Sequence, residues 1–234
     1  MKTAFIQISI ALAFIAGVPQ TSRSEPLAQQ VGDIFVPPPK DMVNVADYSP
    51  HFRKLASAYP SKPFGLYYLL SEFKDIDNGT RIMASRSAEG DIAANFSTES
   101  AAKLGFAKHM AEGEKEFAKM KFSSAEFQKA LEVGQKSTNA SLPTVKIAVS
   151  GMAILDMNLS QATRATIVAV VNSSVTAPGK NIEFTLVYCM GWQLVGKKVV
   201  NLVYAMPLED ASTPTVAKAA LEEWMDSIEK KNAH

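Results

Sequence analysis

Hydrophobic and polar residues alternate along the second half of the chain in a pattern that predicts β-strands. The alternation is longest over residues 182–192, where its apolar positions are Ile182, Phe184, Leu186, Tyr188, Met190 and Trp192. A period of two is typical of a half-buried strand. The same pattern occurs over shorter lengths at residues 145–151, 166–171 and 199–206. Turn-forming residues at 177–180 and 196–197 separate the later segments, so we expect hairpins there.

A further hairpin is predicted earlier in the chain. Residues 64–73 and 80–87 are rich in side chains that favour strands, and Asp77-Asn78-Gly79 stands between them. Asn and Gly tolerate the positive φ angles that tight hairpin turns need. Residues 31–36 predict one additional edge strand, which ends at the proline run that starts at Pro37.

Two central helices are predicted between the two groups of strands. Residues 97–121 are rich in Ala, Lys, Glu and Met. The apolar positions of this segment include Leu104, Ala107, Ala111, Phe117 and Ala118. Ser123 and Glu126 have the spacing of a capping box, which predicts a second helix that runs to about residue 136.

The last predicted helix begins at Thr213-Pro214, because proline is favoured in the first turn of a helix. Its apolar positions, spaced as one helical stripe, are Ala217, Leu221, Trp224 and Ile228. We expect Trp224 to pack this helix on the sheet. The strand residues expected to meet the stripe are Phe184, Leu186 and Tyr188.

This order, ββ-αα-ββββ-α, predicts an α+β fold in which an antiparallel sheet built from hairpins is covered by helices. Residues 64–234 contain no linker-like stretch and are expected to form a single domain. Residues 25–63 are interrupted by prolines and predict an irregular leading segment.

Residues 1–24 have the pattern of a secretory signal peptide. Lys2 precedes an apolar stretch over residues 4–18, and Ser22-Arg23-Ser24 offers a cleavage site after Ser24. An uncleaved membrane anchor is the alternative, but a helix over the apolar stretch would reach only about 22 Å of a hydrocarbon core about 30 Å thick. We therefore expect a periplasmic or secreted protein with no stable membrane span after cleavage.

Composition and charge narrow the class of protein further. The chain has 234 residues, 24 Lys and Arg against 23 Asp and Glu, and one cysteine, Cys189. Near-zero charge without a basic stripe argues against a nucleic-acid partner. A lone cysteine excludes an internal disulfide framework and a Cys-rich metal site. Cys189 lies in the longest alternating segment, which favours a buried structural thiol over a catalytic one.

Residues 191–197 match the G-x-x-x-x-G-K part of a phosphate-binding loop. Lys198 follows, where such a loop needs Ser or Thr, and the next residues predict a strand instead of a helix. Phosphate binding by this loop requires the amides of a helix N-terminus. The pattern therefore indicates a hairpin turn and no nucleotide site.

Other candidate chemistry has simpler structural explanations. His109, Glu112 and Glu116 could share a helix face near a metal, but an exposed charged face explains them better, because a catalytic zinc normally takes three protein ligands. Asp75, Asp77 and Asn78 resemble part of a calcium loop, and a plain turn explains them better. Six aromatic residues could line a ligand pocket, but core packing is the favoured explanation. They are Tyr67, Tyr68, Tyr188, Trp192, Tyr204 and Trp224. We assign no catalytic, cofactor-binding or metal-binding residue, and we expect no cofactor.

The order of elements is accompanied by a C-terminal signature: residues 195–200, the strand that ends in Tyr204-Ala205-Met206, and the helix segment Leu221-Glu222-Glu223-Trp224. On these features, residues 64–232 resemble small secreted bacterial domains of the PsbP-like α/β/α sandwich type. The resemblance implies the sandwich fold and a role as adaptor, stabiliser or binding protein, and it supplies no site residue.

Two functions remain as hypotheses. The first is an exported, non-enzymatic binding or interaction module whose ligand, a protein or a small molecule, is unknown. The alternative is a hydrolase or metal-dependent enzyme whose site is dispersed over loops.

Overall fold

A computed structural model provides the three-dimensional structure. It describes residues 29–31, 33–44, 65–69, 86–119, 146–177 and 180–233. Three predicted features lie outside the described residues: the signal peptide over 1–24, the Asp77-Asn78-Gly79 turn and the helix over 123–136.

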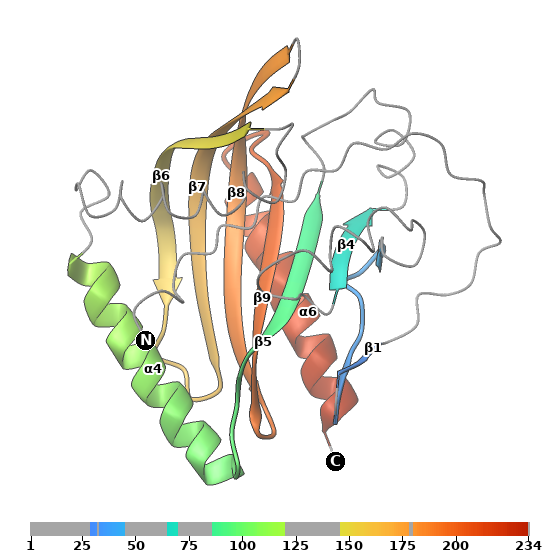
Figure 1. Ribbon diagram of the computed structural model, residues 1–234, viewed down its shortest axis with the longest axis vertical. Coiled ribbons are helices and arrows are strands. Elements are labelled where there is room, and N and C mark those ends of the chain that lie inside the picture. Colours follow the sequence, from blue (N-terminus) through green and yellow to red (C-terminus); the bar gives the residue numbers. More distant parts are fainter. Residues whose placement is uncertain are drawn as a thin grey trace, which may run out of the picture.

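The described elements are nine strands and two helices (Figure 1). In chain order they are β1 (Gln29–Val31), β2 (Ile34–Val36), β3 (Met42–Asn44), β4 (Gly65–Leu69), β5 (Ser87–Asn95), α4 (Glu99–Lys119), β6 (Lys146–Asn158), β7 (Arg164–Ala177), β8 (Lys180–Val195), β9 (Lys198–Pro207) and α6 (Thr213–Asn232). Seven strands form one antiparallel sheet in the order β3-β4-β5-β9-β8-β7-β6. The predicted α+β class and antiparallel sheet are confirmed, whereas the predicted order of elements is not.

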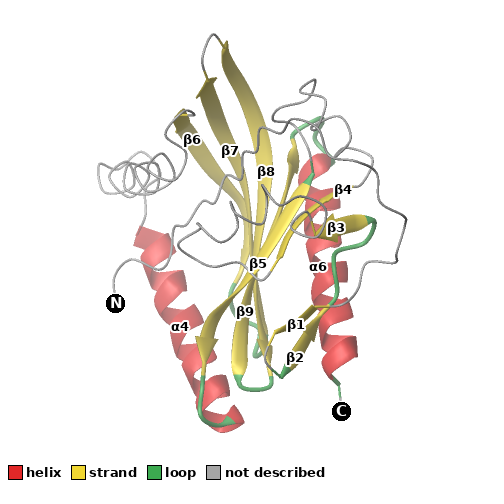
Figure 2. Ribbon diagram, turned by 45° about the vertical axis from the view of Figure 1, so that its right-hand side comes forward, coloured by secondary structure: helices red, strands yellow, loops and turns green. Residues whose placement is uncertain are grey.

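The two helices lie on opposite sides of the sheet (Figure 2). Helix α6 packs mainly on β8 and β9, and α4 contacts the same two strands from the other side. We call the two surfaces of the sheet the α6 face and the α4 face. Within the described residues, no helix is both long enough and apolar enough to cross a membrane.

The first part of the chain differs from the prediction in three places. The single edge strand expected over residues 31–36 is instead the antiparallel pair β1 and β2, which forms a separate sheet. Strand β3, which the sequence pattern does not predict, pairs with β4 at the edge of the main sheet. Strand β5 runs from Ser87 to Asn95, beyond the strand expected over 80–87, because β9 provides a partner along its whole length.

Helix α6 buries the stripe that was predicted from its sequence. Ala217, Leu221 and Ile228 expose 0% of their surface and Trp224 exposes 1%. The Trp224 indole meets the Tyr67 ring edge-on with centroids 5.5 Å apart, and its Nε1 donates a hydrogen bond to the Pro37 carbonyl oxygen at 2.7 Å. The prediction that Trp224 docks this helix is therefore confirmed.

The prediction of which strand residues meet α6 is wrong. The α6 core contains Val187, Cys189 and Val195 of β8. Successive residues of a strand point to opposite faces, so Phe184, Leu186 and Tyr188 belong to the α4 face. Strand β8 is apolar on both faces, and alternation by itself could not show which face meets α6.

A short N-terminal segment, residues 33–44, lies against α6 and is called the strap. Ile34, Val36 and Met42 of the strap are buried in the α6 core. Lys198 of β9 forms an ion pair with Asp33 at the start of the strap. The strap therefore joins the beginning of the described chain to its last helix.

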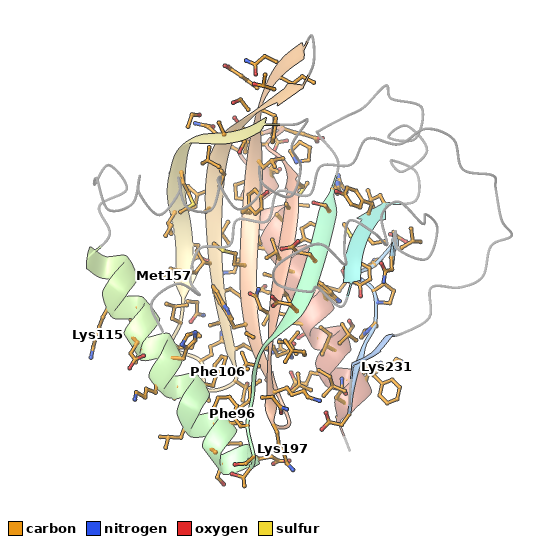
Figure 3. All side chains as sticks on the ribbon, viewed as in Figure 1. Phe96, Phe106, Lys115, Met157, Lys197 and Lys231 are labelled. Carbon is orange, nitrogen blue, oxygen red and sulfur yellow. The ribbon has the colours of Figure 1, made fainter. Side chains whose placement is uncertain are left out.

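Helix α4 presents a different face to the sheet from the apolar positions noted in its sequence. Leu104 exposes 73% of its surface, and Ala107 and Ala111 are also exposed. The buried apolar side chains among the described residues of α4 are Ala102, Phe106 and Met110. Figure 3 shows Phe96 and Phe106 between α4 and the sheet, with Lys115 on the outer side. This core also contains Ile167 and Trp192 of the sheet.

Candidate functional site

The segment that resembles a phosphate-binding loop is a hairpin turn. Gly196 and Lys197 form the turn between β8 and β9, and Val195 pairs with Lys198 across it. Gly196 has φ of +56°, the positive angle that a tight hairpin turn needs at this place. The predicted hairpin is confirmed, and the turn leads into strand β9 where phosphate binding would need a helix.

Two of the predicted metal-site candidates, His109 and Glu112, lie near each other on α4. His109 is half-buried on α4, and burial lowers its pKa while the nearby Glu112 opposes that shift. Glu112 forms an exposed ion pair with Lys108 at 4.0 Å. Within the described part of the chain, no group of three His, Cys, Asp or Glu residues could hold a metal ion. Asp75, Asp77 and Asn78 fall outside the described residues.

Cys189 lies in the α6 core and exposes 0% of its surface. Burial raises the pKa of its thiol to about 12. A thiol with so high a pKa is a weak nucleophile at neutral pH, because the thiolate is the reactive form. The geometry thus agrees with the structural role predicted for Cys189.

The aromatic residues are divided between the two faces. Tyr67, Tyr204 and Trp224 belong to the α6 core, where they pack against aliphatic side chains. Tyr68, Tyr188 and Trp192 lie on the α4 face, and each exposes 8% of its surface or less. Polar and charged groups accompany this second set, so the α4 face is the better candidate for a binding site.

Asp91 is the first of these charged groups. The register pairs Asp91 of β5 with Asn201 of β9, and Asn201 with Trp192 of β8, so the three side chains form one row on the α4 face. Burial raises the pKa of the Asp91 carboxyl above its ordinary value of 3.8, and a hydrogen bond from the Asn201 side chain partly opposes the shift. The buried Asp91 Oδ1 accepts no hydrogen bond from any described residue.

A second row crosses the α4 face next to the first. Tyr68 pairs with Ser87, Ser87 with Ala205, and Ala205 with Tyr188, across strands β4, β5, β9 and β8. We call these four residues the tyrosine row. Glu89 lies two residues after Ser87 on β5 and therefore points from the same face.

The tyrosines of this row are held in their neutral form. Burial raises the pKa of Tyr68 and of Tyr188 well above 10, and the negative charge of Glu89 raises both further. Phenols with raised pKa values donate hydrogen bonds but do not act as bases near neutral pH. The arrangement suits binding better than proton transfer.

Sequence reasoning identified the tyrosines but missed the carboxylates. Glu89 and Asp91 lie in a stretch, residues 87–95, that contains few side chains typical of a strand. Its place in the sheet depends on pairing with β9, more than one hundred residues later. No local pattern could have shown that these carboxylates would stand among buried rings.

Comparisons with known proteins give a limited result. No family model and no curated protein matches the chain. A solved structure of a mutant of protein Mog1 is 12% identical, covers 90% of this chain and 95% of its own length, and has a TM-score of 0.37. The Saccharomyces cerevisiae Ran-binding protein Mog1p is also 12% identical, with coverage of 85% and 87% and a TM-score of 0.33. These likenesses to Mog1 are structural and of low TM-score, and they identify no specific protein.

Proposed function

We propose that this protein is an exported, non-enzymatic binding module, and that its ligand binds on the α4 face of the sheet. The observation that carries the proposal is the half-buried Asp91 carboxylate, whose buried Oδ1 accepts no hydrogen bond from any described residue. Removing a charge from water costs free energy unless it is fully paired. A group that lowers stability in this way is typical of a functional site.

The chemistry of the neighbouring groups supports binding. Asn201 and Tyr188 offer hydrogen-bond donors, and Asp91 offers an acceptor and negative charge. Trp192 lies in the row of Asp91 and is buried in the core beneath α4, which fixes one end of this row. The predicted signal peptide, with cleavage after Ser24, supports the part of the proposal that concerns export to the periplasm or out of the cell.

The variant Asp91→Asn tests the binding face without knowledge of the ligand. If Asp91 is kept for function, the variant removes a destabilising charge and unfolds at a higher urea concentration than the wild type. Small molecules that raise the melting temperature of the wild type should lose this effect in Asp91→Asn. Glu223→Gln, a change at an exposed carboxylate of α6, is the matched control.

Two results would contradict the proposal. One is an Asp91→Asn variant that is clearly less stable than the wild type, which would make Asp91 a structural residue. The other is a set of stabilising compounds that act equally on both proteins, because such compounds bind elsewhere.

Export is tested separately. N-terminal sequencing of the protein released by osmotic shock should give a sequence that begins at Glu25, and a protein that begins at Met1 in the membrane pellet would contradict export.

A further inference from the structure

His109 lies on the side of α4 that faces the sheet. The buried apolar side chains among the described residues of this helix are Ala102, Phe106 and Met110. His109 follows Phe106 by three positions, which puts the two side chains on the same face of the helix. The imidazole is half-buried, whereas Lys108 beside it is exposed. A group that can take up a proton therefore stands at the contact between α4 and the sheet.

The sheet offers this imidazole an apolar surface. The sheet residues of the core beneath α4 include Ile167, Trp192 and Val199. Over their described lengths, β8 and β9, the strands that α4 contacts, place no carboxylate on this face. The carboxylates that the described strands do place on the α4 face are Glu89 and Asp91, which belong to β5, on the far side of β9 from Trp192.

On α4 itself the nearest acidic group is Glu112, three residues after His109. Its negative charge favours the protonated imidazole, but burial has the larger effect and lowers the pKa of His109. Glu112 also forms an ion pair with Lys108 at 4.0 Å, which partly neutralises it. Because removing a charge from water costs free energy, the neutral imidazole suits the docked helix and the charged imidazole suits a helix away from the sheet.

We propose that α4 is docked through a pH-sensitive contact, in which protonation of His109 releases the helix from the strands beneath it. The apolar contact that holds α4 is small, so one charge in the same stripe acts on much of it. The pKa of His109 is lower in the docked state than its ordinary value of 6.5, and the undocked state therefore binds more protons between the two values. Docking is fully supported above about pH 6.5 and weakens as the pH falls below that value.

Native-state hydrogen exchange of the full chain at about pH 5 and at about pH 7.5 provides the test. Exchange rates corrected for the intrinsic effect of pH report how often each element opens. In the wild type, α4 should open at least about threefold more often at the lower pH, while β8 should change by less than about twofold. His109→Gln keeps a polar side chain that does not titrate, and the opening of its α4 should not depend on pH.

Two further variants make the test specific. Lys108→Gln changes an exposed charge of the same helix and should keep the pH dependence of the wild type. His109→Leu suits the apolar contact and should protect α4 better at pH 5 than the wild type does, which tests the inference even if His109→Gln loosens the helix at both pH values. Circular dichroism verifies that each variant is folded.

Three results would overturn the inference. They are a wild-type α4 whose opening does not vary with pH, a pH dependence that persists in His109→Gln, and an equal loss of protection in α4 and β8, which would mean global unfolding. The inference does not depend on the proposed ligand, and Asp91→Asn should keep the wild-type response of α4. Failure here therefore leaves the proposed function untouched.

Discussion

Asn232 holds the backbone of Phe35 with both ends of its side-chain amide. Its Nδ2 donates a hydrogen bond to the Phe35 carbonyl oxygen at 2.7 Å, and its Oδ1 accepts one from the Phe35 N–H at 2.8 Å. The same Nδ2 also donates to the Ile228 carbonyl oxygen at 2.7 Å, one turn earlier in α6. The amide thus pairs with β2 as a neighbouring strand would, and it ties the strap to the end of the helix.

We expect Asn232→Ala to lower the free energy of unfolding by about 1–2 kcal/mol, because two hydrogen bonds to Phe35 are lost together. Urea unfolding measures the change. Lys231→Ala, at the exposed neighbouring position, should change it by no more than about 0.5 kcal/mol. Similar values for the two variants would show that the strap is not held through Asn232.

Trp224→Ala should be among the most damaging single changes. The Trp224 side chain is 1% exposed, packs edge-on against Tyr67 and donates a hydrogen bond to the Pro37 carbonyl oxygen. Its removal should therefore lower the free energy of unfolding by about 3–5 kcal/mol. Changing the exposed neighbour Glu223 to Ala should lower the free energy of unfolding by no more than about 0.5 kcal/mol. An unchanged urea midpoint for Trp224→Ala would mean that α6 is not docked through this residue.

The turn between β8 and β9 permits a comparison of two adjacent residues. A Cβ added at Gly196 would meet no atom within 4 Å, so Gly196→Ala tests only the positive φ of 56° and should cost about 1 kcal/mol. Lys197→Ala should change stability by less than about 0.5 kcal/mol. Thermal unfolding should show no protection by ATP in the wild type; protection that disappears in Lys197→Ala would restore the nucleotide site.

The stability of Asp91→Asn relative to the wild type should depend on pH. The pKa of Asp91 is raised in the folded protein, so between the unfolded and folded pKa values the folded state binds more protons. The contribution of Asp91 to the free energy of unfolding of the wild type therefore falls as pH rises through that window. The advantage of Asp91→Asn should be small near about pH 3 and larger near about pH 7. Urea unfolding across this range measures it, and an advantage that does not vary with pH would contradict the raised pKa.

Much of the fold could be predicted from sequence because its signals are local. The stripe that includes Leu221 and Trp224 repeats at helical spacing within one element, and it is buried as expected. The register that puts Tyr68 and Tyr188 into one row depends on two intervening strands and is not visible locally. The face on which Tyr188 lies was assigned wrongly because β8 is apolar on both sides. The candidate site is therefore a product of tertiary pairing.

The link between Phe35 and Asn232 joins positions 197 residues apart in the chain. Contacts of such long range form slowly, because closing a long loop costs conformational entropy before the contact stabilises the fold. The strap cannot reach its place on α6 until the C-terminal helix has been synthesised. The two ends of the described chain therefore come together only after synthesis has passed Asn232.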